Sequence, residues 1–117
     1  MGIKKYLLPI ILLAILVLPL TASAVGDVKI NDFTASVTSG NVPLHVYFTG
    51  NVTGKVTDWH WKFTNEGTGN VTYSRANATA VHNFGKPGIY DVQLKVFGPG
   101  GNDTLIKNAY ITVNATT

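Results

Sequence analysis

The sequence contains no cysteine. It therefore forms no disulfide bond, no thiolate metal site and no thiol-based catalytic centre, although small exported domains often depend on disulfides. Only 13% of the residues are charged, and no run of lysine and arginine with interleaved aromatic residues occurs, which argues against a nucleic-acid partner. From residue 25 onward no window repeats its apolar residues with the 3.6-residue period of a helix. These absences leave a helix-free domain whose core is held by packing alone.

One long apolar run is present, at residues 7–20, and it lies near the N-terminus. Lys4 and Lys5 precede this run, and the small residues Ala22-Ser23-Ala24 follow it. This order predicts a secretory signal peptide over residues 1–24, a domain over residues 25–117, and a secreted or cell-surface location. The run of 14 residues is short against the ~20 needed to span a bilayer. An uncleaved membrane anchor remains the alternative.

The acidic residues of the predicted domain are few and scattered. Seven lysines and arginines remain beyond residue 24 against six acids, so the domain is nearly neutral. No two carboxylates are spaced as a convincing acid–base pair, and the Ser-Gly at Ser39 indicates a turn rather than a nucleophile elbow. The sequence therefore predicts no catalytic residue and no enzyme.

Short stretches that alternate apolar and polar residues follow one another from residue 25, separated by clusters of glycine, proline, asparagine and aspartate. Regularly spaced short strands of this kind are typical of an all-β sandwich, here of about seven strands. In the first of them, Phe33, Ala35 and Val37 are expected on one face. The expected strands are 28–37, 44–48, 59–63, 71–74, 80–84, 90–96 and 105–113.

The stretch DWHWKFTNEG (residues 58–67) allows two interpretations. Trp59, Trp61 and Phe63 fall on one face of a strand, and the polar residues 60, 62 and 64 fall on the other. A half-buried core strand needs this alternation, which favours a core role over an aromatic ligand platform. The platform interpretation stays open for Trp59, which lies nearest to the loop.

The three histidines do not have the short spacing of metal ligands. His45 and His60 lie on polar faces and are expected to be solvated. His82 shares a face with Phe84 and is expected to make a structural hydrogen bond. The turns NEGTGN and GGNDT hold too few acids for a calcium loop. No metal site and no cofactor is predicted.

Acceptor motifs for N-linked glycans are frequent beyond residue 24. All lie in expected turns, in the short edge segment or in the C-terminal tail, so a glycan-coated surface is predicted if the exported protein is glycosylated. The candidate asparagines are Asn51, Asn70, Asn77, Asn102 and Asn114.

Three segments, SGNVPLHVYF (39–48), WHWKFTNEG (59–67) and VHNFGKPGIYDVQLKV (81–96), resemble the motifs of the PKD (polycystic kidney disease) domain family in order and spacing. With GGNDT and YITV, the resemblance covers nearly all of residues 25–117. It implies an immunoglobulin-like β-sandwich found in extracellular proteins, including archaeal envelope proteins. It also implies a role in protein or carbohydrate contacts, or in spacing other domains, without catalysis.

The resemblance also implies roles for single residues. Trp61 would take the buried position of the third strand, and Tyr90 would form a tyrosine corner two residues before Val92. Asn65-Glu66-Gly67 replaces the Gly-Asp-Gly that is common in the family, which weakens any inference of calcium binding. The core signature implied by the resemblance is Trp61, Phe63, Tyr90, Val92 and Leu94.

Two functional hypotheses remain. The first is a secreted or cell-surface module that contacts an extracellular protein or glycan. The alternative is a structural subunit that assembles through its edge strands into an extracellular filament or surface layer. Tyr110 is expected to anchor the contact surface, because exposed tyrosines are enriched in interface hot spots. The predicted contact face consists of His60, Lys62, Asp91, Gln93, Lys95, Tyr110 and Thr112.

Overall fold

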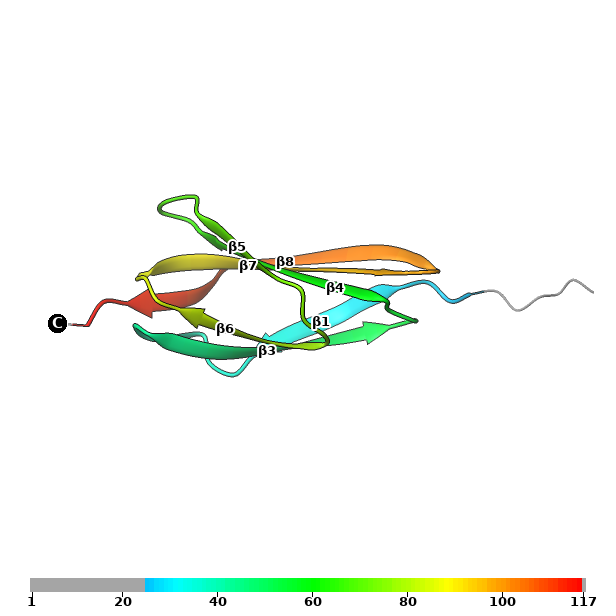
Figure 1. The fold of residues 1–117 in the computed structure, drawn as a ribbon, viewed down its shortest axis with the longest axis horizontal. Coiled ribbons are helices and arrows are strands. Elements are labelled where there is room, and N and C mark those ends of the chain that lie inside the picture. Colours follow the sequence, from blue (N-terminus) through cyan, green and yellow to red (C-terminus); the bar gives the residue numbers. More distant parts are fainter. Residues whose placement is uncertain (1–24, 117) are drawn as a thin grey trace, which may run out of the picture.

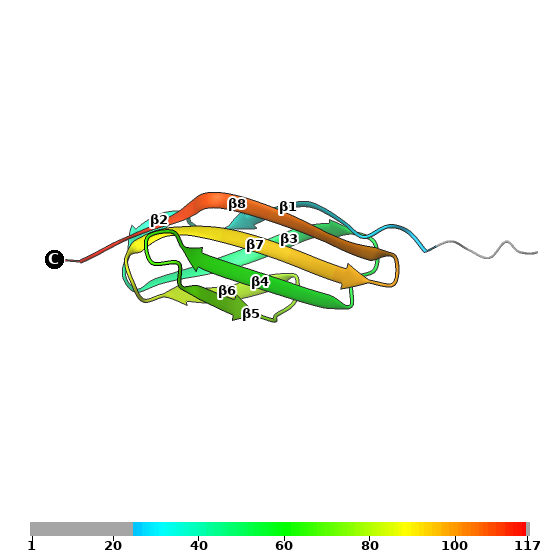
Figure 2. The same ribbon diagram turned by 90° about the horizontal axis from the view of Figure 1, so that it is seen from above.

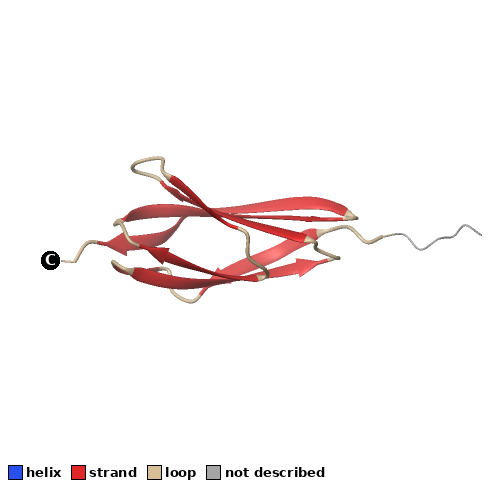
Figure 3. Cartoon of the chain, in the orientation of Figure 1, coloured by secondary structure: helices blue, strands red, loops and turns tan. Residues whose placement is uncertain are grey.

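The computed structural model describes residues 25–116, so the predicted signal peptide lies outside the described residues. The described chain is built of strands and loops without a helix, as Figure 3 shows. Two sheets pack face to face, which confirms the predicted all-β sandwich (Figure 1). The strands are β1 (Lys29–Ala35), β2 (Ser39–Asn41), β3 (Leu44–Thr53), β4 (Asp58–Asn65), β5 (Val71–Ser74), β6 (Thr79–Phe84), β7 (Gly88–Gly98) and β8 (Gly101–Asn114).

The smaller sheet has the strand order β1-β3-β6, and the larger sheet has the order β2-β8-β7-β4-β5. All neighbours are antiparallel except β2, which runs parallel to β8. Seen from above, β5 and β6 lie along one side of the sandwich, and β1 lies with β8 along the other (Figure 2). One side of the sandwich therefore brings together the edge strands β5 and β6 of the two sheets, and the other side brings β1 beside β8, the neighbour of the short edge strand β2.

Aromatic rings form the centre of the core. Trp61 is fully buried and meets Phe33 of the opposite sheet edge to face, with ring centroids 5.4 Å apart. Phe48 lies 5.1 Å from Phe63. The indole Nε1 of Trp61 donates a hydrogen bond of 3.1 Å to the carbonyl oxygen of Asn77. The aromatic stripe on β4 is therefore part of the core and is no exposed platform.

Trp59 is half-buried and packs beside Gly50 on β3. A Cβ atom at Gly50 would lie 3.0 Å from both Trp59 and Leu94, so this glycine lets two large side chains approach the backbone. From the sequence, a loop was expected to begin at Thr49. The strand instead continues to Thr53, because β1 pairs with it along this whole stretch.

Two further expectations were wrong in detail. Residues 39–41 were expected in a turn, but they form β2, whose three residues pair with the C-terminal end of β8. Val37 was expected to face inward with Phe33, but it lies beyond the end of β1 and is exposed. Both differences arise where the chain crosses from the smaller sheet to the larger one.

Tyr90 forms the tyrosine corner that the family resemblance implied. Its ring is buried, and its hydroxyl donates a hydrogen bond of 2.7 Å to the carbonyl oxygen of Lys86. Trp61, Phe63, Val92 and Leu94, the other residues of the core signature, are also buried. The corner fixes the entry of the chain into β7.

Candidate contact face of the five-stranded sheet

The outer face of the larger sheet gathers four of the predicted contact residues. His60 lies opposite Lys95, and Lys62 lies opposite Gln93, across the β4–β7 pair. Side chains that pair directly across antiparallel strands lie within about 5.5 Å at Cβ. Each of these four side chains is partly exposed. They therefore form one continuous patch at the middle of the sheet.

Tyr110 does not belong to this patch, so its predicted place on the contact face was wrong. Its ring meets the ring of Phe33 at a centroid distance of 5.7 Å, between the two sheets. The cause is a bulge in β8, where residues 108–110 all lie opposite the single residue Asp91. Ala109 has a φ of 51° there, and its N–H donates a hydrogen bond of 2.8 Å to Asp91 Oδ1. The bulge breaks the alternation from which the outward position of Tyr110 was predicted.

Tyr73 on β5 is an exposed aromatic residue of this face that sequence reasoning missed. Its side chain is 67% exposed, and it lies directly opposite Lys62. On the far side of Gln93, Ile106 of β8 is 51% exposed. A row of four cross-strand neighbours thus runs over the sheet, with an exposed apolar residue at each end. The alternation of VTYS was the available signal, because Trp61 and Phe63 pair with its polar residues and direct its apolar residues outward.

Positive charge collects in the centre of the face. Lys62 and Lys95 lie there, and Arg75 follows the end of β5. Within residues 25–116 the one ion pair joins Lys107 to Asp32, so none of these three cations is neutralised by a carboxylate partner. The Lys95 ammonium lies 5.3 Å from the centroid of the Phe97 ring, and the His60 ring lies 5.0 Å from that centroid.

A hollow of about 240 Å³ adjoins this basic centre where β5 ends. Beyond Ser74 no strand of the described residues pairs with this edge of β4, since β5 pairs with Trp61 to Thr64. The hollow brings an aromatic ring, an imidazole and a guanidinium to one place. Its lining residues are His60, Trp61, Tyr73, Ser74 and Arg75.

The acids of this sheet stand at its two ends. Asp58 lies at one end of β4, and Glu66 and Asp91 lie toward the other. A side-chain hydrogen bond with the neighbouring Asp91 carboxyl group raises the pKa of Glu66. The carboxyl groups of this sheet are therefore set apart from its basic centre.

The structure holds His82 by stacking. Its ring lies 4.2 Å from the Phe63 ring at an interplanar angle of 12°, and it meets Phe84 edge on at 4.5 Å. Burial lowers the pKa of His82. The expected structural hydrogen bond was wrong, because none to this ring is found within residues 25–116. His45 is exposed and His60 is half-buried.

The turn that replaces Gly-Asp-Gly is organised by an amide. Asn65 is 6% exposed, and its Oδ1 accepts hydrogen bonds from the N–H groups of Gly67 at 2.9 Å and Thr68 at 3.2 Å. Gly88 has a φ of 151°, and a Cβ atom there would lie 2.6 Å from Asn65 Nδ2. Among the residues that the structure describes, no three histidine or acidic side chains are grouped to hold a metal ion.

Two packed sheets of this topology, a tyrosine corner and a buried tryptophan on the third long strand define an immunoglobulin-like module. The chain belongs to the PKD domain family, whose family model matches residues 32–111. Domains of this family are non-catalytic modules, typical of extracellular regions, that mediate protein or carbohydrate contacts. A comparison with curated protein sequences gave no match. Within residues 25–116, no helix is long and apolar enough to cross a membrane.

Proposed function

We propose that this protein is a secreted or cell-surface glycoprotein of the cell envelope that binds an acidic extracellular partner through the outer face of its five-stranded sheet. The proposal takes residues 1–24 as a cleaved signal peptide and residues 25–117 as the mature domain. The domain acts by contact alone, without a bound metal or cofactor.

The exposed ring of Tyr73 beside unpaired cations carries this proposal. A tyrosine buries a large contact area at a low entropic cost, and for this reason it is favoured in binding surfaces. Lys62 lies directly opposite it, and Arg75 lines the adjoining hollow. Carboxylate or sulfate groups of a protein or a glycan match this charge.

Retention on acidic columns tests the proposal. The purified chain is passed over immobilised polyglutamate and immobilised polygalacturonate, and the salt concentration at elution is measured. Lys62→Glu with Tyr73→Ala should lower that concentration on the column that retains the protein, because the pair removes a cation and the main apolar contact.

Tyr47→Ala is the matched control. Tyr47 is 55% exposed on the outer face of the other sheet. The Tyr47→Ala variant should therefore elute at the same salt concentration as the unchanged protein. Equal retention of the double variant and the unchanged protein would contradict the proposed contact face. A loss with Tyr47→Ala alone would move the contact to the three-stranded sheet.

Self-assembly through sheet edges is the second candidate function. The edge of β6 favours it, because within residues 25–116 this strand of the three-stranded sheet pairs only with β3. Size-exclusion chromatography at several concentrations separates the two candidates. A subunit of a filament or layer elutes earlier as its concentration rises, whereas a single contact module does not.

A further inference from the structure

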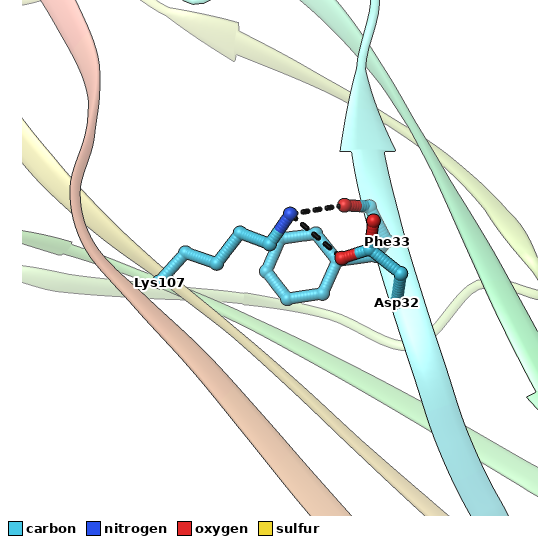
Figure 4. Close-up of polar contacts among 3 residues, drawn as sticks. All are labelled: Asp32, Phe33 and Lys107. Atoms are coloured by element: carbon cyan, nitrogen blue, oxygen red, sulfur yellow. Dashed lines mark hydrogen bonds and ion pairs between the residues drawn. The ribbon is translucent and has the colours of Figure 1, made fainter.

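The edge strands on the two sides of the sandwich differ in how far their backbone groups are kept from pairing with a further strand. On one side, side chains of β8 bond the backbone of the edge strand β1. The Ile30 N–H donates to Asp103 Oδ2 at 2.8 Å. Lys107 Nζ donates to the carbonyl oxygen of Phe33 at 2.6 Å and pairs with Asp32 at 2.8 Å, as Figure 4 shows. These contacts occupy backbone groups that a further strand would need.

On the other side, β6 has no such cover. The Gly50 N–H donates to the Ala78 carbonyl oxygen at 2.8 Å, and antiparallel pairs alternate between bonded and non-bonded positions. The backbone groups of Thr79, Val81 and Asn83 therefore point away from β3. No hydrogen bond to these groups is found within residues 25–116.

The side chains of β6 do not discourage pairing either. The strand reads TAVHNF and contains no proline, lysine or acid, the residues that commonly block an exposed edge. Val81 is 51% exposed at its middle. A second copy of this chain presents the same edge, so two copies can pair β6 to β6 in an antiparallel, self-complementary contact.

Two glycan acceptor motifs bracket this edge. Asn77 lies two residues before β6 begins. Asn70 lines a groove of about 390 Å³ together with His82, Asn83 and Phe84, which form the end of β6. The loop that carries Asn70 and the connection that carries Asn77 stand toward opposite ends of β6 in Figure 1. Six residues of strand span roughly 20 Å, a length that two bulky glycans can screen.

Both acceptor side chains are available for modification. Asn70 and Asn77 are exposed, and no hydrogen bond to either side-chain amide is found within residues 25–116. Asn65, five residues before Asn70, instead has its amide engaged at both ends. The Asn51 amide oxygen also has a partner, since it accepts a hydrogen bond of 3.4 Å from Asn31.

We propose that N-linked glycans on Asn70 and Asn77 prevent two copies of this chain from pairing through the β6 edge. In the modification, the side-chain nitrogen bonds to the anomeric carbon of an oligosaccharide carried on a lipid phosphate or pyrophosphate. The bond from that carbon to the phosphate oxygen breaks, the lipid phosphate leaves with the electron pair, and the amide loses one proton. The inference rests on the export assumed in the proposed function.

The fraction of Asn70 and Asn77 that carries a glycan is measured first. The full chain is secreted from a host that N-glycosylates exported proteins, and its glycopeptides are analysed by mass spectrometry. Glycans are expected on both Asn70 and Asn77. A secreted chain without sugar at these two positions overturns this inference and leaves the proposed contact face untouched. A chain that is never exported contradicts the proposed function itself.

The effect of removing the glycans on self-association is measured next by sedimentation. Thr72→Ala with Thr79→Ala removes both acceptor motifs and keeps both asparagines, and it should raise the self-association constant about tenfold or more. Thr72→Ser with Thr79→Ser keeps both motifs and should stay monomeric. Asn102→Gln removes a motif in the β7–β8 hairpin, remote from β6, and should change nothing. Unchanged association after loss of both glycans overturns the proposed shielding.

The variant Val81→Pro tests whether self-association takes place through the β6 edge. Proline removes the outward N–H of Val81 and leaves the bonds to β3 intact, and edge strands tolerate it. Added to Thr72→Ala with Thr79→Ala, it should return the protein to the monomer. Circular dichroism checks that each variant is folded. If Val81→Pro unfolds the chain, Val81→Lys takes its place, because an edge lysine repels its own copy. Association that persists in a folded edge variant overturns the assignment to β6.

Discussion

The two faces of the five-stranded sheet obey different rules. On the inner face, Trp61 and Phe63 of β4 are completely enclosed by the opposite sheet. On the outer face, His60 and Lys62 of the same strand stand partly in solvent beside an exposed tyrosine. Close packing fixes the identity of an inner residue, because a cavity or an overlap is costly. The outer face is free of that constraint, so its aromatic ring and cations are better indicators of function.

The largest expected effect comes from one substitution on each face of β4. Trp61→Ala should lower the free energy of unfolding by about 3–5 kcal/mol, because it empties the centre of the core and leaves the Asn77 carbonyl without its indole donor. His60→Ala should cost less than about 0.5 kcal/mol. Urea melts of the two variants check this difference. Equal costs would show that β4 does not separate an inner face from an outer one.

A smaller effect is expected from the removal of one hydroxyl on each face. Tyr90→Phe breaks the hydrogen bond to the Lys86 carbonyl oxygen and should cost about 1 kcal/mol. Tyr73→Phe removes an exposed hydroxyl and should leave the free energy of unfolding, measured by urea melts, unchanged within about 0.5 kcal/mol. A costly Tyr73→Phe would reveal a structural role on the outer face, where we propose a contact surface.

Alternation along the chain was sufficient to predict most of the inner face. The order of the apolar residues in β4 and β7 placed Trp61, Phe63, Val92 and Leu94 on the buried side, because each has a strand of the other sheet opposite it. The reasoning failed at Gly50, which was expected in a loop and lies within β3. Its actual role is to make room for Trp59 and Leu94, and such a contact depends on residues far away in the chain.

The outer face was harder to predict, for two physical reasons. The bulge in β8 turns Tyr110 toward Phe33, and no local pattern announces a bulge whose partner is Asp91 on another strand. In β5 the polar side chains lie on the inner side of the sheet and the apolar ones on the outer side. This is possible because Thr72 borders the groove next to β6 and does not enter the packed core. Tyr73 therefore points outward. Register between strands, which decides both cases, is not encoded in the residues of one segment.

The smallest expected effect is a loss of stability in acid that is caused by His82, whose side chain is half-buried. His82 stacks on Phe63 and lines the groove, where Lys86 is the one lysine among the lining residues. Burial lowers its pKa from the ordinary value of 6.5, so the folded protein favours the neutral ring. The unfolded chain takes up a proton first as the pH falls. The stabilisation is therefore complete above pH 6.5 and is lost as the pH drops through the lower pKa of the folded state.

Melting midpoints between pH 7.5 and pH 5 should fall for the unchanged protein, and His82→Gln should flatten that fall. His45→Gln, at an exposed position, is the control and should leave it in place. A pH dependence that survives in His82→Gln would assign the acid sensitivity to the carboxylates, among which Glu66 and Asp91 interact with each other.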